Sequence, residues 1–247
     1  LEKYLDIVAI GTVADIVPLV LDNRKFVKRG LKLLNNTKWT GIKQLLRKIF
    51  PDNWDTREYF AYDVGYIIAP IFNAAGRLED AKQAVSLFIE EDGFKCLSII
   101  DKLLENNTER KDIQKKILEM SVVEIEKKQL YNKNLILVAN KSFHHGVIGI
   151  VASKILDKYY KPTIIMEIKE NEGIATASCR SIEGLNIVEC LNSVSDILVK
   201  YGGHSGAAGF TIKIENIEEF YQRIDKFIEE NFDKDLFIKK LKIEKIL

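Results

Sequence analysis

The segment YGGHSGAAGF, residues 201–210, combines one histidine with four glycines and two alanines. Residues without bulky side chains let the backbone approach a ligand closely and offer it successive N–H groups. The imidazole of His204 and the N–H groups of Gly202 and Gly203 could therefore hold a phosphate or a carboxylate. Because glycine-rich turns between helices and strands are common, composition alone leaves an ordinary turn equally open.

A second segment with phosphate-suited chemistry is ATASCRSIEGLN, residues 175–186. Ser178 and Arg180 are two positions apart, so on a strand their side chains lie on the same face. A guanidinium binds phosphate through two parallel hydrogen bonds, and a serine hydroxyl adds another donor. The spacing is consistent with a phosphate fork, although an edge strand with a solvated arginine would show the same pattern.

Two more segments repeat this chemistry. FNAAGRL, residues 72–78, places Asn73 and Arg77 among small residues at the end of an apolar helix. SFHHGVIGI places His144 and His145 just before a helix, where the helix dipole favours an anion. Ordinary helix packing and surface histidines are the alternatives. We expect no metal site at the histidine pair, because adjacent side chains should diverge and no third ligand is near.

The first half of the chain has the apolar spacing of helices. LEKYLDIVAIGTVAD predicts a helix that ends before Pro18, with Asp15 at or just past its end. Further helices are predicted over 23–35, 41–50 and about 60–76, with Asp80 as the cap of the next helix. No segment of this half reads as a convincing strand. Residues 93–128 are densely charged and predict one or two long, exposed helices joining two bodies.

The second half changes to an alternation of strands and helices. The expected order is a strand (134–140), a helix (146–160), a hairpin around Asn-Glu-Gly (162–179), a helix (186–202), a strand (209–214) and a closing helix (216–232). Asn216 is expected to cap the last helix. The predicted fold class is α/β, with a helix-rich region, a long connecting helix and a compact α/β domain.

Composition limits the classes of function. The 247 residues carry 37 basic and 36 acidic side chains, so a site for a polyanion must be local. The three cysteines (Cys96, Cys179 and Cys190) are expected to be reduced thiols of a cytoplasmic protein. No signal peptide is expected. The longest apolar stretch, Val8 to Leu21, contains Asp15 and Pro18 and is too short for a bilayer, so no membrane partner is expected.

Five segments, taken in order, resemble the RecJ family of single-strand-specific exonucleases within the DHH phosphoesterase superfamily. They are AIGTVADIVPL, NAAGRL, HHGVIGIVASKIL, CRSIEG and GGHSGAAGF. The resemblance runs from Leu5 to about Ile214. GTVADIVPL is similar to the RecJ form of the superfamily's fourth motif, whereas GGHSGAAG is similar to a motif of the DHH-associated domain and is shared more widely.

The resemblance implies a division of the chain. Residues 1–92 would be the C-terminal part of a DHH phosphoesterase domain, 93–128 a connecting helix, 129–235 the DHH-associated substrate-binding domain and 236–247 the start of a linker. The Asp-His-His motif of the superfamily is absent from this sequence. We therefore expect a piece of a longer protein that lacks the upstream metal-binding region and is inactive by itself.

The resemblance also implies roles for the singled-out residues. Asp15 would be a ligand of a two-metal Mn²⁺ or Mg²⁺ site in a dry, apolar frame, against the alternative that it caps a turn before Pro18. The remaining roles concern the substrate. The 5′-terminal phosphate would be held by Ser178, Arg180 and Arg77, with Asn73 nearby. His204, with Gly202 and Gly203, would be the catalytic contact to the scissile or neighbouring phosphate. His144 would be a further substrate contact, and Cys179 would slightly crowd Ser178.

The function implied is that of a metal-dependent 5′-to-3′ exonuclease on single-stranded DNA in repair and recombination. A cleft too narrow for a duplex would select single strands. A monomer is expected, with single-strand-binding protein or helicase partners. Two alternatives remain: a phosphoesterase on short oligonucleotides or small nucleotides, and a non-catalytic nucleic-acid-binding fragment. An unrelated scaffold would require five ordered coincidences and is set aside.

Overall fold

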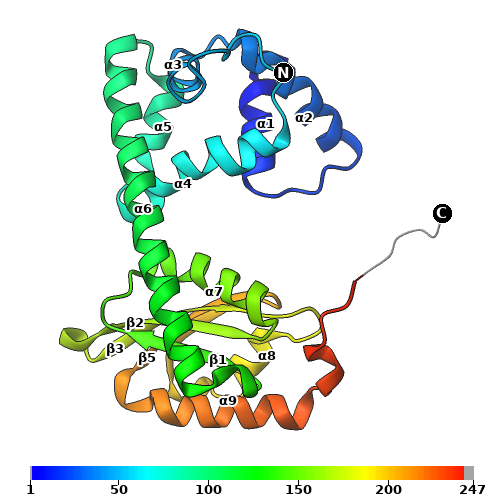
Figure 1. Ribbon diagram of the computed structural model, residues 1–247, viewed down its shortest axis with the longest axis vertical. Coiled ribbons are helices and arrows are strands. Elements are labelled where there is room, and N and C mark those ends of the chain that lie inside the picture. Colours follow the sequence, from blue (N-terminus) through cyan, green and yellow to red (C-terminus); the bar gives the residue numbers. More distant parts are fainter. Residues whose placement is uncertain (1, 242–247) are drawn as a thin grey trace. The chain divides into compact units, whose positions relative to one another are not determined.

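A computed structural model of the chain describes residues 2–241, so residues 242–247 of the expected linker lie outside the described residues. The chain divides into two compact units after Lys111. The boundary falls inside one continuous 36-residue helix, α6 (Gly93–Lys128), which contributes to both units (Figure 1). Within residues 2–241, every helix is too short or too polar to span a lipid bilayer.

The first unit is helical, as the sequence predicts, and its described residues contain no strand. A six-residue π-helix, Asp63–Ile68, runs directly into α4, so the helix predicted over about 60–76 has two parts. Asp80 is not the cap of α5, contrary to expectation, because Ala81 occupies that position; the Asp80 carboxylate nevertheless accepts from the N–H of Lys82 at 2.9 Å. The helices are α1 (Leu5–Ala14), α2 (Leu21–Leu33), α3 (Thr40–Ile49), α4 (Ala69–Leu78) and α5 (Lys82–Ile89).

Close packing of α1 on α2 fixes the chain on both sides of Asp15. A Cβ added at Gly30 would lie only 2.0 Å from the carbonyl oxygen of Leu5, so glycine lets the two helices touch. The buried carboxylate of Asp6 accepts from the Thr37 hydroxyl at 2.7 Å and from the Trp39 indole at 3.2 Å. These bonds offset the cost of burying a charge and fasten the segment after α2 to the first turn of α1.

Helix α6 differs from the exposed connector that the charge density predicts. Its first part buries Cys96, Ile100 and Leu103 in the apolar core of the first unit. Its later part buries Ile117 and Ile125. The apolar residues recur at helical spacing, so a narrow stripe is buried while the charged majority faces solvent.

The second unit is built on a five-stranded sheet in the order β1-β2-β3-β5-β4. Strands β1 and β2 pair in parallel and are joined through α7 (His145–Tyr159), and the other pairs are antiparallel. Helix α7 packs on one face of the sheet, and α8 (Ile187–Asn192) and α9 (Ile217–Asn231) cover the other (Figure 1). The strands are β1 (Ile136–Asn140), β2 (Thr163–Lys169), β3 (Ile174–Arg180), β4 (Leu198–His204) and β5 (Ala207–Lys213).

The single helix predicted over 186–202 is wrong. Helix α8 ends at Asn192, a 3-10 turn follows at Ser195–Ile197, and Leu198–His204 forms the edge strand β4. Pairing with β5 produces this strand, and that contact is invisible in a local apolar pattern.

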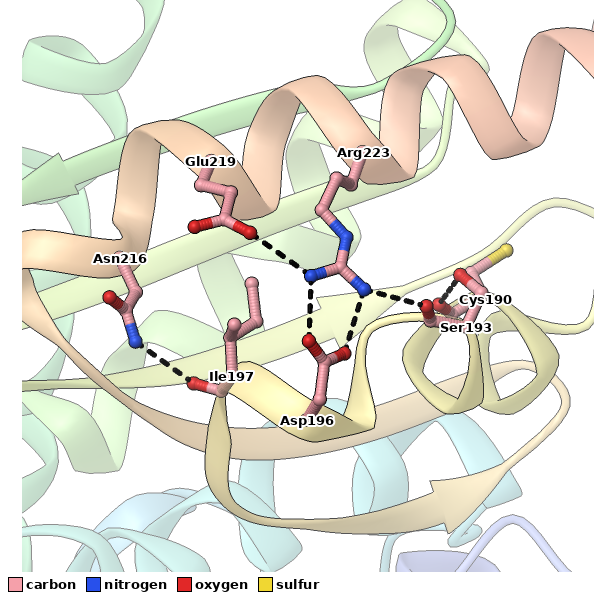
Figure 2. Close-up of polar contacts among 7 residues, drawn as sticks. All are labelled: Cys190, Ser193, Asp196, Ile197, Asn216, Glu219 and Arg223. Atoms are coloured by element: carbon pink, nitrogen blue, oxygen red, sulfur yellow. Dashed lines mark hydrogen bonds and ion pairs between the residues drawn. The ribbon is translucent and has the colours of Figure 1, made fainter.

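Arg223 on α9 anchors the start of β4 (Figure 2). Its guanidinium donates to both carboxylate oxygens of Asp196, at 2.7 and 2.8 Å, and to the carbonyl oxygen of Ser193 at 3.2 Å. The bond to Arg223 holds the pKa of Asp196 below its usual value. Asn216 makes no capping bond, contrary to expectation; its amide lies 3.5 Å from the carbonyl oxygen of Ile197. These contacts tie the segment before β4 to α9.

Candidate functional site

Ser178 and Arg180 of β3 share one face, as their spacing predicts. The Nη1 atom of Arg180 donates to the Ser178 hydroxyl at 3.1 Å, and its Nε donates to the hydroxyl of Ser153 on α7 at 3.1 Å. Nη1 also donates to the carbonyl oxygen of Cys179 at 2.7 Å. Burial lowers the pKa of Arg180, but an arginine remains cationic at neutral pH. The result is a half-buried cation held in one orientation between a strand and a helix.

Gly149 allows α7 to approach this pair. A Cβ added at Gly149 would lie 3.0 Å from the Ser178 hydroxyl oxygen and 3.1 Å from Nη2 of Arg180. Both distances are tighter than ordinary van der Waals contact, so a larger residue would displace the ends of the two side chains.

The β4–β5 hairpin extends the same face of the sheet. Arg180 is paired with Ala207, which is paired with His204, and Ser178 is paired with Gly209 in the adjacent row. Directly paired residues lie on one face, and neighbouring strands are about 4.8 Å apart, so the backbones of Arg180 and His204 are about 10 Å apart. We call this surface the sheet shelf, comprising Ser178, Arg180, Gly202, His204, Ala207 and Gly209.

The glycine segment is therefore mostly strand, and not a loop between the predicted helix 186–202 and the predicted strand 209–214. Gly202 and Gly203 belong to β4, and only Ser205 and Gly206 form the turn. At Gly203 the φ angle is +153°, and a Cβ there would lie 2.4 Å from the carbonyl oxygen of Ala207, so only glycine fits. As an edge strand, β4 still leaves alternate backbone groups without a strand partner, which is the property expected of a phosphate cradle.

Two of the histidines each accept a backbone hydrogen bond through Nδ1. His204 is exposed, and its Nδ1 accepts from the N–H of Gly206 at 3.3 Å, which leaves Nε2 toward solvent. His144 caps α7, with Nδ1 accepting from the N–H of Gly146 at 3.1 Å. The expected divergence of the histidine pair is wrong, because the rings of His144 and His145 stack with centroids 4.8 Å apart.

Cys179 does not crowd Ser178. Successive strand residues face opposite sides, so Cys179 lies in the core beneath α8 and α9 and is fully buried. Burial raises the pKa of its thiol above the usual value. All three cysteines are free and buried.

Asn73 and Arg77 belong to the first unit and lie on α4. Both are exposed, and their spacing of four residues places them on one face of the helix. Sequence reasoning missed a neighbouring cation, Arg110 of α6, because a single arginine does not stand out in the densely charged sequence of that helix. Burial lowers the pKa of Arg110, with a further contribution from the positive charge of Arg77, and its Nη2 donates to Asn107 at 2.7 Å.

Asp15 ends α1, as predicted, but it is exposed and not enclosed in an apolar frame. The side chain of the next residue, Ile16, is also solvent-exposed. Across residues 2–241, no group of three or more His, Cys, Asp or Glu side chains could hold a metal ion. Mn²⁺ and Mg²⁺ require about six oxygen ligands, so the described residues do not by themselves fit either ion.

Comparison with known proteins first defines the class of the second unit. Residues 132–230 match the family model of the DHHA1 domain. Over nearly its whole length the chain is similar to the single-stranded-DNA-specific exonuclease RecJ. It is 37% identical over 237 residues to RecJ of Bacillus subtilis (strain 168), covering 96% of this chain and 30% of that protein. With Escherichia coli (strain K12) RecJ the identity is 31%, covering 96% and 42% respectively.

Solved structures agree with the sequence comparison. The crystal structure of RecJ in complex with Mn²⁺ from Thermus thermophilus matches with a TM-score of 0.78 and 30% identity, covering 94% of this chain and 33% of that chain. The complex with Mg²⁺ matches equally well. The resemblance to the RecJ family is thereby confirmed, together with the α/β fold class. The chain spans less than half the length of the curated RecJ relatives.

Proposed function

We propose that this chain is the end-binding part of a metal-dependent 5′-to-3′ exonuclease that hydrolyses phosphodiester bonds in single-stranded DNA. The observation that carries the proposal is the Ser178–Arg180 pair, which Ser153 orients at the edge of a shelf of small residues ending in His204. The similarity to proteins named single-stranded-DNA-specific exonucleases supports the same activity.

Ser178 and Arg180 would bind the 5′-terminal phosphate. A terminal phosphate carries more charge and one more free oxygen than an internal phosphodiester, so a fixed guanidinium favours it. Half-burial of Arg180 lowers the local dielectric constant and strengthens the attraction. Arg77, with Asn73, is proposed as a contact that the first unit makes to the strand. Recognition of the terminal phosphate would give the enzyme its polarity.

His204 is proposed as the catalytic contact on the shelf. Since its Nδ1 accepts from Gly206, Nε2 is the atom available to a phosphate oxygen. The backbone at Gly202 and Gly203 would lie along the same phosphate, and the absence of side chains there permits close approach. His144, at the start of α7, is proposed as an additional substrate contact, with Nε2 again the free nitrogen.

Asp15 is proposed as one ligand of a two-ion Mn²⁺ or Mg²⁺ site whose other ligands are not in this chain. RecJ structures with each of these ions are similar to this chain, which supports the choice of metal. A carboxylate oxygen is the donor type that both ions prefer. We accordingly propose that this chain alone binds a strand end without cleaving it.

The wider setting is also a proposal. We place residues 1–92 in a DHH phosphoesterase domain, 93–128 in the connecting helix and 129–235 in the substrate-binding domain. We propose a cytoplasmic monomer that acts in DNA repair and recombination, with a single-strand-binding protein or a helicase as partner.

The test uses a longer protein that contains this chain together with the missing metal ligands. With Mn²⁺, it should degrade strands whose 3′ end is blocked and spare strands whose 5′ end is blocked. Asp15→Asn should lower turnover at least a hundredfold while strand binding changes little. Asp22→Asn, an exposed carboxylate on α2, is the matched control and should retain activity. Digestion from the 3′ end, or full activity in Asp15→Asn, would contradict the proposal.

A further inference from the structure

The first unit has a groove that the proposed site does not use. It lies between α2 and the segment 56–61, and its volume is about 530 Å³. We call it the α2 groove. Its lining residues are Leu19, Arg24, Val27, Lys28, Leu31, Lys32, Asn35 and residues 56–61.

The cations of α2 divide into two sets. Lys25 and Arg29 lie outside the groove and pair with Asp22 and Glu2. The other three basic residues line the groove, are exposed, and form no ion pair with any residue in the range 2–241. They are Arg24, Lys28 and Lys32. Their spacing of four residues places them in one line, with steps of about 6 Å along the helix axis.

The opposite wall of the groove is held in place by its own hydrogen bonds. The Asn35 side chain donates to the carbonyl oxygens of Arg57, at 2.9 Å, and Asp55, at 3.2 Å. The guanidinium of Arg57 donates to one carboxylate oxygen of Asp63 at 2.7 Å, and the N–H of Phe60 donates to the other at 2.8 Å. Asp63 neutralises Arg57, and the exposed carboxylate of Glu58 also lines this wall. The three cations of α2 outnumber that one carboxylate, so the groove keeps a net positive charge on its α2 side.

The floor and rim of the groove are apolar and aromatic. Val27 and Tyr59 are buried, and the Tyr59 hydroxyl donates to the carbonyl oxygen of Trp54 at 2.6 Å. Phe60 leaves 56% of its surface exposed at the rim. Two further exposed rings follow in the sequence, Tyr62 and Tyr66, and they stack on each other with centroids 4.8 Å apart.

We infer that the α2 groove binds a single-stranded nucleic acid, with successive phosphates on Arg24, Lys28 and Lys32 and a base against Phe60. A line of unpaired cations beside exposed aromatic faces is the arrangement that binds single strands without reading sequence. The regular spacing of the cations favours a repeating phosphate backbone over an acidic peptide. The inference rests on the proposed function, since Leu19 in the groove is only four residues beyond Asp15.

The test measures binding of the 247-residue chain to a 20-nucleotide oligo(dT) with a 5′-hydroxyl, by fluorescence anisotropy over a range of salt concentrations. Lys28→Gln/Lys32→Gln should weaken binding at least tenfold at low salt. It should also make the slope of log K against log salt shallower by about 1.4, which is 0.7 for each lost phosphate contact. Lys25→Gln/Arg29→Gln removes the same charge from the same helix and should change affinity less than threefold. Equal losses in both variants would overturn the inference.

Two further arms separate the groove from its alternatives. Phe60→Leu should lower the affinity for the strand several-fold. Binding of a glutamate-rich peptide in the groove in place of the strand would overturn the inference. Lys28→Gln/Lys32→Gln should lower the affinity for 5′-phosphorylated and 5′-hydroxyl strands by the same factor. If the wild type prefers the phosphorylated strand but Lys28→Gln/Lys32→Gln binds as tightly as the wild type, binding in the α2 groove is refuted and the end-binding function is not. If Lys28→Gln/Lys32→Gln binds more weakly than the wild type but the wild type shows no preference for a 5′-phosphate, the end-binding function is refuted and binding in the α2 groove is not.

Discussion

Neighbouring residues of β3 have opposite roles because a strand alternates its faces. Arg180 and Ser178 lie on the sheet shelf, while Cys179 between them is buried in the core. Period-two spacing predicts that Ser178 and Arg180 share a face. It cannot predict that Ser153 orients Arg180, because that contact joins residues 27 apart through packing of α7 on β3.

Ser153→Ala tests whether the orientation of Arg180 matters. Loss of the acceptor for Nε should reduce the preference for a 5′-phosphate about three- to tenfold, since such a bond contributes roughly 1 kcal/mol. Binding of 5′-hydroxyl strands should not change. Lys154→Ala on the same helix serves as the control in the same titration. A preference equal to that of the wild type would remove Ser153 from the site.

Thiol reactivity tests the burial of the cysteines. Burial raises the pKa of Cys190 to about 12 and also raises the pKa values of Cys96 and Cys179. The nucleophilic thiolate is therefore scarce at pH 8. We expect the folded chain to react with a thiol reagent far more slowly than the chain in denaturant, which should titrate three thiols. Rapid reaction of one thiol in the folded chain would contradict the described core.

At the scale of elements, the sequence predicts most helices and the β2–β3 hairpin, because their periodicity and turn residues are local. Strand β4 is missed for a physical reason: its glycines have low strand propensity, and its extended form depends on pairing with β5. The shelf therefore follows from a tertiary contact. The residues that form it could be selected from the sequence, but their common face could not.

Gly149→Ala tests the contact between α7 and β3. Alanine should favour the helix by about 1 kcal/mol, but its Cβ would crowd the Ser178 and Arg180 side chains. These effects oppose each other, so we expect a small change in the free energy of unfolding. The preference for a 5′-phosphate should nevertheless fall several-fold. Chemical denaturation and strand titration measure the two effects, and an unchanged preference would contradict close packing at this position.

The pair of Asp196 and Arg223 predicts an acid-sensitive anchor for β4. The pKa of Asp196 is lowered in the folded chain, so its contribution to stability is present above the ordinary aspartate pKa of about 3.9 and is lost as the pH falls through the lowered value. The unfolding midpoint in urea, measured from pH 6 to pH 3, should fall less steeply for Arg223→Gln than for the wild type. Identical pH profiles would show that the pair contributes nothing.

At the scale of the whole molecule, each unit carries its own candidate residues. Asp15, Asn73 and Arg77 lie in the first, and the sheet shelf with His144 lies in the second. The order of the motifs along the chain predicts the family, because five separate segments must agree. Sequence reasoning selected these segments because small residues occur beside charged ones. It overlooked the α2 groove because the cations of α2 follow the pattern of an ordinary amphipathic helix.

Metal addition tests the proposal that the chain holds only one carboxylate of the metal site. A single exposed carboxylate binds Mn²⁺ weakly, so millimolar Mn²⁺ should leave the unfolding temperature unchanged within about 1 °C. The same measurement on Asp15→Asn gives the baseline. A clear rise that Asp15→Asn removes would mean that this chain forms a metal site by itself.

A titration with strands that differ at the 5′ end tests whether the chain recognises a 5′-terminal phosphate. Oligo(dT) strands that differ only in a 5′-phosphate are bound to the wild-type chain and to Arg180→Ala at low salt. The wild type should prefer the phosphorylated strand. Arg180→Ala should lose about 1–3 kcal/mol on that strand and almost nothing on the hydroxyl strand. Equal affinity of the wild type for both strands, or equal losses on both in Arg180→Ala, would contradict recognition of the 5′-terminal phosphate.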